Sequence, residues 1–70
     1  MLDNLKQWLT PRELESEYSI SISTQAKWRM DRKIPFSKVG KFIRYNREDI
    51  NQWLKNNAIK PLDEVVQNEN

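Results

Sequence analysis

The sequence predicts one mainly α-helical domain with a β-hairpin, arranged in the order helix, turn, helix, hairpin, helix. Three capping signals each precede a short segment that is predicted to be helical, and the first and third of these segments show helical spacing of apolar residues. The only glycine of the 70 residues lies between two short runs of aromatic and β-branched residues, as expected for a tight hairpin turn. A chain of this length can form only one domain with a small core.

The first helix is expected to run from about residue 11 to 18. Thr10 and Glu13 have the spacing of a capping box, in which each side chain bonds to the backbone amide of the other. Pro11 suits the first helical position, because the amide there has no partner within the helix. The surface of this helix carries further glutamates that repel phosphate, so we expect it to support the fold rather than to bind a polyanion.

A second helix is expected to start at the cap Ser21 and to end near Met30 or Arg32. The turn before it is very short, and Ile20 within this turn is expected to be buried between the two helices. Helix, turn and helix form the first supersecondary unit of the chain.

Pro35 ends this helical region, and two strands are predicted at residues 36–39 and 42–45. Gly40 begins the two-residue loop between them, and glycine at this position suits a type II′ turn. Side chains alternate along the second strand between an inner and an outer face. We expect Ile43 and Tyr45 on the inner face and Phe42 and Arg44 on the outer face.

A third helix is predicted from the N-cap Asn46 to about Asn56, with acidic residues in its first turn, where the helix dipole favours them. Its apolar stripe consists of Ile50, Trp53 and Leu54.

The folded domain is predicted to span residues 9–57. Residues 1–8 form a lead-in that either adds a short helical turn or covers one end of the core. Residues 58–70 are acidic and poor in apolar side chains, so we expect a mobile tail.

Charge is unevenly distributed along the chain, although the net charge is only +2. Residues 23–47 carry eight basic side chains and one acidic side chain, a net charge of +7, whereas residues 1–22 and 48–70 have net charges of −2 and −3. A basic central third indicates a polyanionic partner, with nucleic acid as the first candidate. The alternative is a solvated basic face without a ligand.

Several function classes lack the residues that they need. The chain has no cysteine and no histidine for disulfides or the usual zinc sites. The carboxylate pairs Glu48/Asp49 and Asp63/Glu64 are adjacent in sequence, and adjacent side chains on a helix point in different directions. We therefore expect no catalytic activity, no metal and no cofactor. No apolar stretch suits a membrane span or a secretory signal, and we expect a cytoplasmic protein.

One set of residues recurs with the spacing of a known family: Trp8-Leu9-Thr10-Pro11, Ile20-Ser21, Ser23-Thr24, Lys27-Trp28, Ile34-Pro35-Phe36, Val39-Gly40-Lys41, Ile43-Arg44-Tyr45, Arg47-Glu48-Asp49-Ile50 and Trp53-Leu54. With these residues the chain resembles, over residues 8–54, the excisionase and AlpA-like family of MerR-like winged helix-turn-helix domains, in which the hairpin is the wing. The sequence departs from the common residues of the family at five positions. Glu15 replaces a small residue, Ile22 replaces an arginine and Gln25 replaces an apolar residue. Ser19 and Arg32 stand where the family often has glycine.

The resemblance implies that the second helix enters the major groove of double-stranded DNA, while the hairpin tip reaches an adjacent minor groove. Candidate base-reading residues are Ser23, Thr24, Gln25 and Lys27, of which Gln25 ranks lowest because the family position faces inward. For Ser23 and Thr24, helix capping and surface solvation are the alternative roles.

Further candidates lie on the wing, at Lys41, Phe42 and Arg44, and at the expected phosphate contacts Arg29, Arg32, Lys33, Lys38 and Arg47. Phe42 is unusual, because the family often has a basic residue there. An outward aromatic residue could wedge or stack in DNA or meet a protein neighbour, but we expect it to pack on Phe36. Trp28 and Trp53 are expected in the core rather than as stacking platforms for single-stranded bases.

The resemblance implies that the protein is an excisionase, or recombination directionality factor, of a mobile element in a bacterium or phage. It would bind adjacent DNA sites, bend the DNA and assist an integrase, with weak or DNA-dependent self-association. The alternative that uses the same surface is an AlpA-like transcriptional regulator. An alternative from another class is a protein-interaction adaptor that docks through its C-terminal tail.

Overall fold

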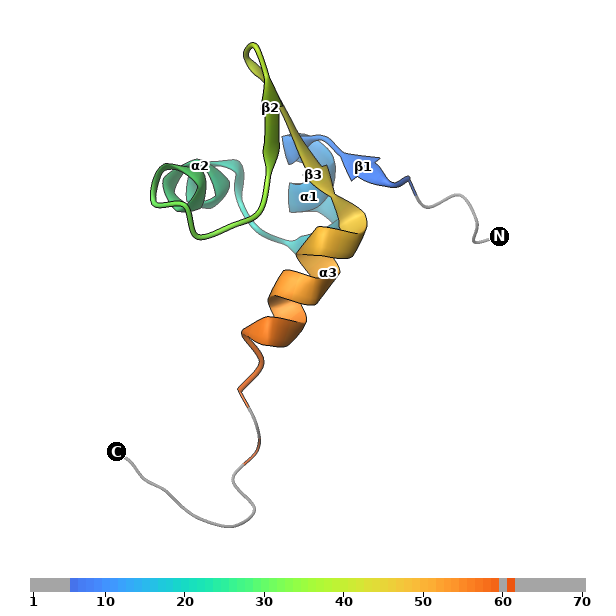
Figure 1. Cartoon of the computed structure of the whole chain (residues 1–70), viewed down its shortest axis with the longest axis vertical. Helices are drawn as coiled ribbons and strands as arrows, with labels where there is room; N and C mark the ends of the chain where they lie inside the picture. Colours follow the sequence, from blue (N-terminus) through green and yellow to red (C-terminus); the bar gives the residue numbers. More distant parts are fainter. Residues whose placement is uncertain (1–5, 60, 62–70) are drawn as a thin grey trace.

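The computed structural model describes residues 6–59 and residue 61. Its elements are β1 Trp8–Leu9, α1 Pro11–Tyr18, α2 Ile22–Met30, β2 Ser37–Val39, β3 Phe42–Asn46 and α3 Arg47–Asn56. The hairpin of β2 and β3 extends to one side of the molecule and α3 to the other (Figure 1). Three helices and an antiparallel sheet confirm the predicted winged helix-turn-helix fold. Most of the expected tail and residues 1–5 of the expected lead-in lie outside the described residues.

β1 is a short strand that was not expected. It pairs antiparallel with β3, with Trp8 opposite Asn46 and Leu9 opposite Tyr45, so that the sheet order is β1-β3-β2. Leu9 is fully buried, and this segment therefore covers the core as a strand rather than as a helical turn. Two residues are too few for an alternating pattern to reveal a strand in the sequence.

All three predicted helix caps are present. The Thr10 hydroxyl accepts a hydrogen bond from the Glu13 amide at 3.1 Å, and the Glu13 carboxylate accepts from the Thr10 amide at 2.9 Å. The side chains of Ser21 and Asn46 likewise accept from the third amide of α2 and of α3, at 3.2 Å and 3.0 Å. These bonds satisfy amides that have no partner within the helix and so fix where each helix begins.

The Glu13 carboxylate also binds Lys6, whose Nζ lies 2.8 Å from Oε2. The hydrogen bond from Lys6, followed by the bond from the Thr10 amide, lowers the pKa of Glu13 from 4.5 to about 2. A carboxyl group whose pKa is lower in the folded than in the unfolded state stabilises the fold at pH values above its unfolded-state pKa. This contribution is lost as the pH falls toward the folded-state pKa.

We therefore expect the free energy of unfolding of the native sequence to fall between pH 4.5 and about pH 2 more steeply than that of the Glu13→Gln variant. Urea titrations at several pH values would measure both slopes. Glu15→Gln, at an exposed position in the same helix, is the matched control and should leave the slope unchanged. Parallel pH curves for Glu13→Gln and the native sequence would contradict the role of this ion pair.

The hairpin turn is of the predicted type. Val39 lies opposite Phe42, so the loop contains only Gly40 and Lys41. Gly40 has a φ of 60°, and Lys41 has a negative φ. A positive φ at the first loop position alone is the pattern of a type II′ turn.

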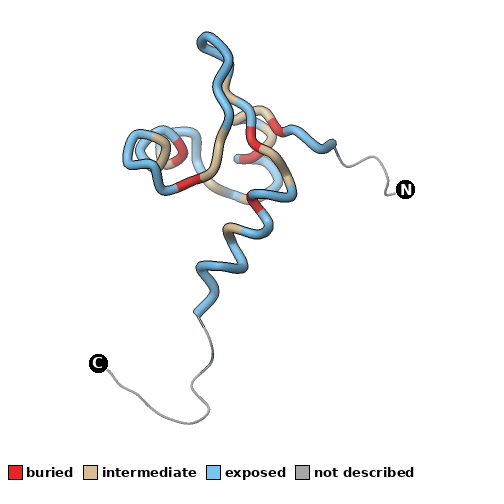
Figure 2. Tube along the Cα trace, viewed as in Figure 1, coloured by how far each residue is buried: buried red, intermediate tan, exposed pale blue. Residues whose placement is uncertain are grey.

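The core consists of one buried apolar residue from each of five segments, Leu9, Leu14, Ile34, Tyr45 and Ile50 (Figure 2). Trp28 and Trp53 pack against it, as predicted, with ring centroids 5.7 Å apart and an edge-to-face angle of 65°. Leu54 was expected in the apolar stripe of α3, but it is exposed. It lies in the last turn of α3, which extends beyond the core.

Two helices end in left-handed backbone at residues other than glycine. Ser19 after α1 has a φ of 58°, and Arg32 after α2 has a φ of 59°. At the end of α2, the amides of Arg32 and Lys33 donate to the carbonyls of Arg29 and Trp28 at 3.0 Å and 2.7 Å, the two bonds of a Schellman motif. Both left-handed positions are ones where the family that the sequence resembles usually has glycine.

Replacing Ser19 or Arg32 by glycine should therefore stabilise the fold. A left-handed residue with a Cβ atom costs roughly 1 kcal/mol or more. The larger entropy of glycine in the unfolded chain offsets part of this gain, so we expect each change to raise the free energy of unfolding by about 0.5–1 kcal/mol.

Thermal unfolding would detect this gain, because 1 kcal/mol corresponds to roughly 4–8 °C in a domain of this size. Ser16→Gly, at an exposed position within α1, is the matched control and should destabilise by about 0.5 kcal/mol, the difference in helix propensity between serine and glycine. If all three glycine variants were destabilised to the same extent, the backbone strain at the two helix ends would be disproved.

Candidate nucleic-acid interface

One face of α2 is open to solvent and carries Ser23, Ala26, Lys27 and Met30. Their spacing of i, i+3, i+4 and i+7 keeps them on one side of the helix. Ser23 and Lys27 were predicted from the sequence to lie here, whereas Ala26 and Met30 were not, although extending the helical period from Ser23 identifies both. Met30 is 83% exposed. This open face therefore presents hydroxyl, ammonium and thioether groups together.

Thr24 lies beside this face and takes part in the cap of α2. Its hydroxyl accepts a hydrogen bond from the Ser21 hydroxyl at 2.9 Å, and its amide donates to the same Ser21 oxygen. The Ser23 hydroxyl lies 3.3 Å from that oxygen and is exposed. Capping, the alternative role that the sequence left open, thus describes Thr24, which is half-buried, better than Ser23.

Gln25 lies in the core, which corrects the expectation that it reads a base. Its side chain is 0% exposed, and its Nε2 donates to the carbonyls of Pro11 and Ile20 at 3.0 Å and 2.8 Å. These bonds tie α2 to the start of α1 and to the turn between the two helices. Within the described residues its Oε1 has no hydrogen-bond partner. The Gln25 amide is therefore unavailable to a DNA base.

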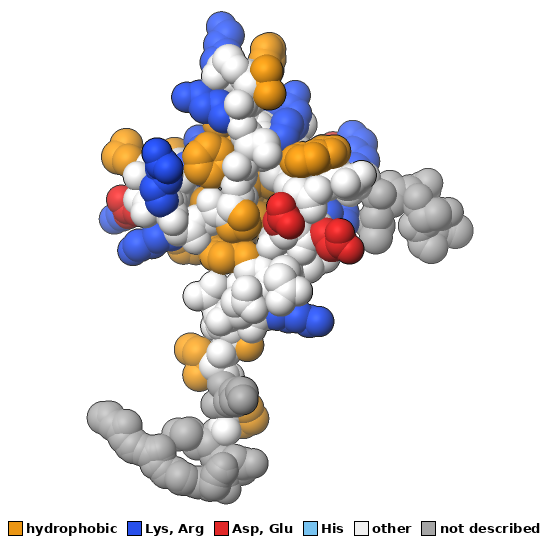
Figure 3. Space-filling view, viewed as in Figure 1, with side chains coloured by type: hydrophobic (Ala, Val, Ile, Leu, Met, Phe, Trp, Pro, Cys, Tyr) orange, Lys and Arg blue, Asp and Glu red, His pale blue; other side chains and the backbone are white. Residues whose placement is uncertain are grey.

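A groove of about 470 Å³ lies between α2 and the inner face of the wing, lined by Ala26, Arg29, Met30, Phe36, Lys38, Lys41 and Ile43. Every charged side chain in this lining is basic. Lys and Arg side chains also follow the hairpin and surround the end of α2 on the face drawn in Figure 3. The groove joins the open face of α2 to the wing, so that the two form one continuous surface.

Arg29 is held in this groove by Tyr45, to whose hydroxyl oxygen its Nη1 donates a hydrogen bond. Tyr45 is fully buried. Burial raises the pKa of the Tyr45 phenol, and the hydrogen bond from Arg29 opposes this effect. Tyr45 therefore stays neutral at physiological pH and keeps the guanidinium of Arg29, a positive charge, in place beside Lys38 and Lys41.

The outer face of the wing carries Phe42 and Arg44. Phe42 is 60% exposed, and the guanidinium carbon of Arg44 lies 5.8 Å from the centroid of its ring. The expectation that Phe42 packs on Phe36 is corrected, because Phe36 packs against the core and lines the groove together with Ile43. Neighbouring residues of a strand point to opposite faces, so Phe42 points away from Ile43 and from the groove.

Arg47 was expected to contact phosphate, but its guanidinium is used inside the fold. Its Nη1 lies 2.7 Å from a carboxylate oxygen of Glu17, and its Nε donates to the Lys6 carbonyl at 2.6 Å. Its backbone amide donates to the Gln7 carbonyl at 2.7 Å. Only 15% of its side chain is exposed. Arg47 thus connects α3 to α1 and to the chain before β1, and we remove it from the set of phosphate contacts.

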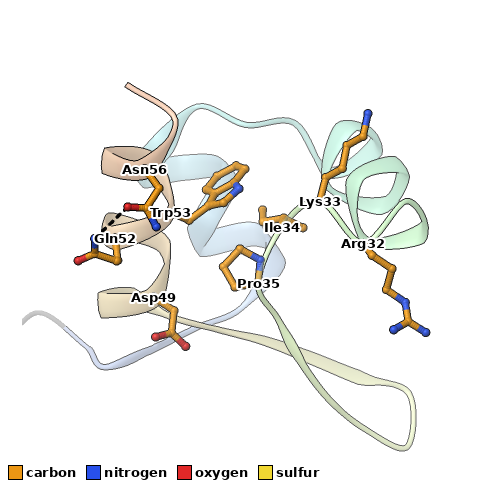
Figure 4. A pocket seen from close by; sticks show the side chains of 8 residues that line it. All are labelled: Arg32, Lys33, Ile34, Pro35, Asp49, Gln52, Trp53 and Asn56. Atoms are coloured by element: carbon orange, nitrogen blue, oxygen red, sulfur yellow. Dashed lines mark hydrogen bonds between the residues drawn. The ribbon is translucent and has the colours of Figure 1, made fainter. Parts of the chain in front are cut away.

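Arg32 and Lys33 lie at the end of α2 and point in opposite directions (Figure 4). Both border a second pocket of about 430 Å³, whose other lining residues are Ile34, Pro35, Asp49, Gln52, Trp53 and Asn56. An acidic side chain in this lining makes the pocket a poorer match for phosphate than the groove beside the wing. Both residues are exposed, and neither lines that groove.

The acidic side chains of the helices lie outside the groove. Glu13 and Glu17 of α1 pair with Lys6 and Arg47. Glu48 and Asp49 occupy the first turn of α3. The described residues contain no group of three or more acidic side chains that could hold a metal ion. No helix among them is long and apolar enough to cross a membrane.

A comparison with known protein families finds one match in agreement with this geometry. A family model described as a helix-turn-helix domain matches residues 8–58, which include every helix and strand of the described part of the chain. No curated protein and no solved structure matches the chain.

Proposed function

The chain belongs to the helix-turn-helix domain family, and we propose that it is a sequence-specific double-stranded-DNA-binding protein that acts as an excisionase. The family consists of DNA-binding domains, which typically have no catalytic activity. The observation that carries the proposal is the continuous surface formed by the open face of α2, the groove and the wing. In this groove every charged lining residue is basic.

In the proposed complex, α2 lies in the major groove, which is about 12 Å wide and admits one helix. Ser23 and Lys27 then face the base edges, where a lysine ammonium pairs best with the O6 and N7 atoms of guanine. Ala26 and Met30 on the same face offer apolar contacts to thymine methyl groups. Thr24 supports the start of the helix and borders the same bases.

One phosphate strand passes between α2 and the wing in this arrangement. Arg29 and Lys38 contact it from the two sides of the groove, while Lys41 and Arg44 approach the minor groove, whose negative potential attracts cations. Arg32 and Lys33 contribute further phosphate contacts at the end of α2. Such contacts supply affinity and register, whereas the open face of α2 supplies the sequence preference.

The excisionase role rests on the resemblance of residues 8–54 to the excisionase and AlpA-like family. In this role the protein performs no reaction itself. It binds adjacent sites, associates with further copies on the DNA and helps an integrase to assemble.

Selection from a pool of random duplexes at moderate salt tests the DNA-binding part of this proposal. We expect one short motif to be enriched, and recovery of duplexes without any common motif would disprove specific binding. It would instead favour the adaptor that docks through its tail.

The excisionase role needs a separate test, in which the genes beside the one for this protein are searched for an integrase and excision by that integrase is measured with and without the protein. Stimulated excision is the expected result. Unchanged excision together with altered transcription from a promoter that carries the selected motif would show that the protein acts as a transcriptional regulator and not as an excisionase.

A further inference from the structure

Next to the hairpin turn, the outer face of the wing carries two apolar residues that take no part in the DNA contacts proposed above. Val39 and Phe42 lie opposite each other as the last cross-strand partners of the hairpin. They are 76% and 60% exposed, and only Gly40 and Lys41 lie beyond them. Two large apolar side chains thus stand together beside the turn of the hairpin, and this hairpin projects from the rest of the domain (Figure 1).

The fold holds this pair in a defined position. The two-residue turn at Gly40 keeps the strands paired up to the tip, and the opposite face of β3 is anchored by Ile43 and Tyr45, of which Tyr45 is fully buried. Arg44 lies against the Phe42 ring at a cation–π distance. Because the pair is already exposed in a rigid hairpin, little conformational entropy remains to be lost when it enters a binding site.

The charges around the pair favour DNA over a protein surface. Every charged residue between Asp31 and Glu48 is basic. A polyanion with an apolar interior, such as the base stack of a duplex, matches an apolar pair surrounded by cations. A protein partner would need an apolar site for the same pair, surrounded by acidic side chains that match the basic residues of the wing.

We propose that Val39 and Phe42 form a wedge that enters the minor groove with the wing tip and partly unstacks one base step. This proposal rests on the proposed DNA-binding function. The minor groove is about 6 Å wide, and the backbones of the two hairpin strands alone are about 4.8 Å apart, so the tip can enter only where the groove is widened, as it is where an inserted side chain kinks the duplex. Apolar side chains inserted between base pairs open the step and kink the duplex.

The test uses the full chain and its selected duplex, in which the fluorescent adenine analogue 2-aminopurine replaces one base at a time. Unstacking raises the fluorescence of this analogue. We expect a rise at a single step, on the side of the motif that the wing reaches. Phe42→Ala should abolish the rise and weaken binding about tenfold, the loss expected when roughly one phenyl group leaves an apolar contact.

Two further variants separate a wedge from a charge contact. Phe42→Arg should recover affinity through an added phosphate contact and show a steeper salt dependence, but the fluorescence should stay low. Ile59→Ala, at a position 94% exposed outside the wing, is the matched control and should behave like the native sequence. Because Phe42 is exposed, thermal unfolding of its variants should be unchanged.

The outcomes distinguish the wedge from the function on which it rests. If selection enriches no motif, the proposed function and the wedge both fail. If the native protein binds its motif without a rise in fluorescence, or if Phe42→Ala retains the rise, only the wedge is overturned. If Phe42→Ala leaves binding to one site unchanged but prevents a second copy from joining on a two-site duplex, the pair meets a protein neighbour, and the wedge is again overturned.

Discussion

The Gln25→Glu variant is expected to be largely unfolded at room temperature and neutral pH. The native amide donates to two backbone carbonyls in a site with no solvent exposure. A carboxylate there would face the same two oxygen atoms without a donor between them. The buried carboxyl group can avoid its charge only by taking up a proton, which at neutral pH costs about 3–4 kcal/mol for a group with an ordinary pKa of about 4.3. The protonated group has one donor for two carbonyls, so one of them loses its partner at a further cost of about 1–3 kcal/mol, and the sum is comparable with the whole stability of about 5 kcal/mol expected of so small a domain. Far-ultraviolet circular dichroism and urea titration would measure the loss.

Ala26→Glu is the matched control for this change, because it adds the same charge one residue along α2 at an exposed position. It should alter the free energy of unfolding by less than about 0.5 kcal/mol. Gln25→Met keeps the size of the side chain and also removes the unpartnered Oε1, so its cost should be only about 1–2 kcal/mol. Equal stability of Gln25→Glu and Ala26→Glu would show that position 25 is not buried.

The double variant Lys38→Ala/Lys41→Ala is expected to lose about 100-fold in DNA affinity near 0.1 M salt. Each lysine neutralises about one phosphate, and the release of counterions makes binding depend on salt, so the slope of log K against log salt should fall by about two units. Selected and unrelated duplexes should lose affinity to nearly the same extent, because Lys38 contacts phosphate and Lys41 is attracted by the negative potential of the minor groove, and neither reads a base edge. Fluorescence anisotropy at several salt concentrations would measure both quantities.

Lys55→Ala removes an exposed charge from the last turn of α3 and serves as the control, with an unchanged slope. Lys27→Ala should behave differently from both. It should reduce the preference for the selected duplex by about 1–3 kcal/mol, because it removes a contact to base edges. If single alanine variants of Lys27, Lys38 and Lys55 were indistinguishable, the division between base-reading and phosphate contacts would be refuted.

The sequence was sufficient to predict the helix starts and the hairpin turn, because their chemistry is local. Thr10 and Glu13 are three residues apart, and the turn depends on one residue, Gly40, that adopts a positive φ. The basic stretch from residue 23 to 47 likewise indicated a polyanionic partner for the part of the chain that forms α2 and the wing, since charge near a residue can be counted without knowing the fold.

Contacts between distant segments could not be predicted in this way. Arg47 and Glu17 are 30 residues apart, and Arg47 and Lys6 are 41 apart, so nothing near Arg47 in the sequence distinguishes it from the exposed Lys38. The side chain of Gln25 is of a type that often reads bases, but its amide donates a hydrogen bond to the carbonyl of Pro11, which is 14 residues away in the sequence. The partners of a side chain, rather than its type, decide whether its charge or amide is available to a ligand.

The most direct test of the proposed interface is an NMR titration of the 15N-labelled chain with its selected duplex. We predict that the largest shifts of backbone amides fall in two segments, residues 22–30 and residues 37–44, which come from α2 and the wing. The amides of Glu15 in α1 and of Lys55 in α3 should change little. Shifts concentrated in α1 and α3, with α2 and the wing unchanged, would contradict the account.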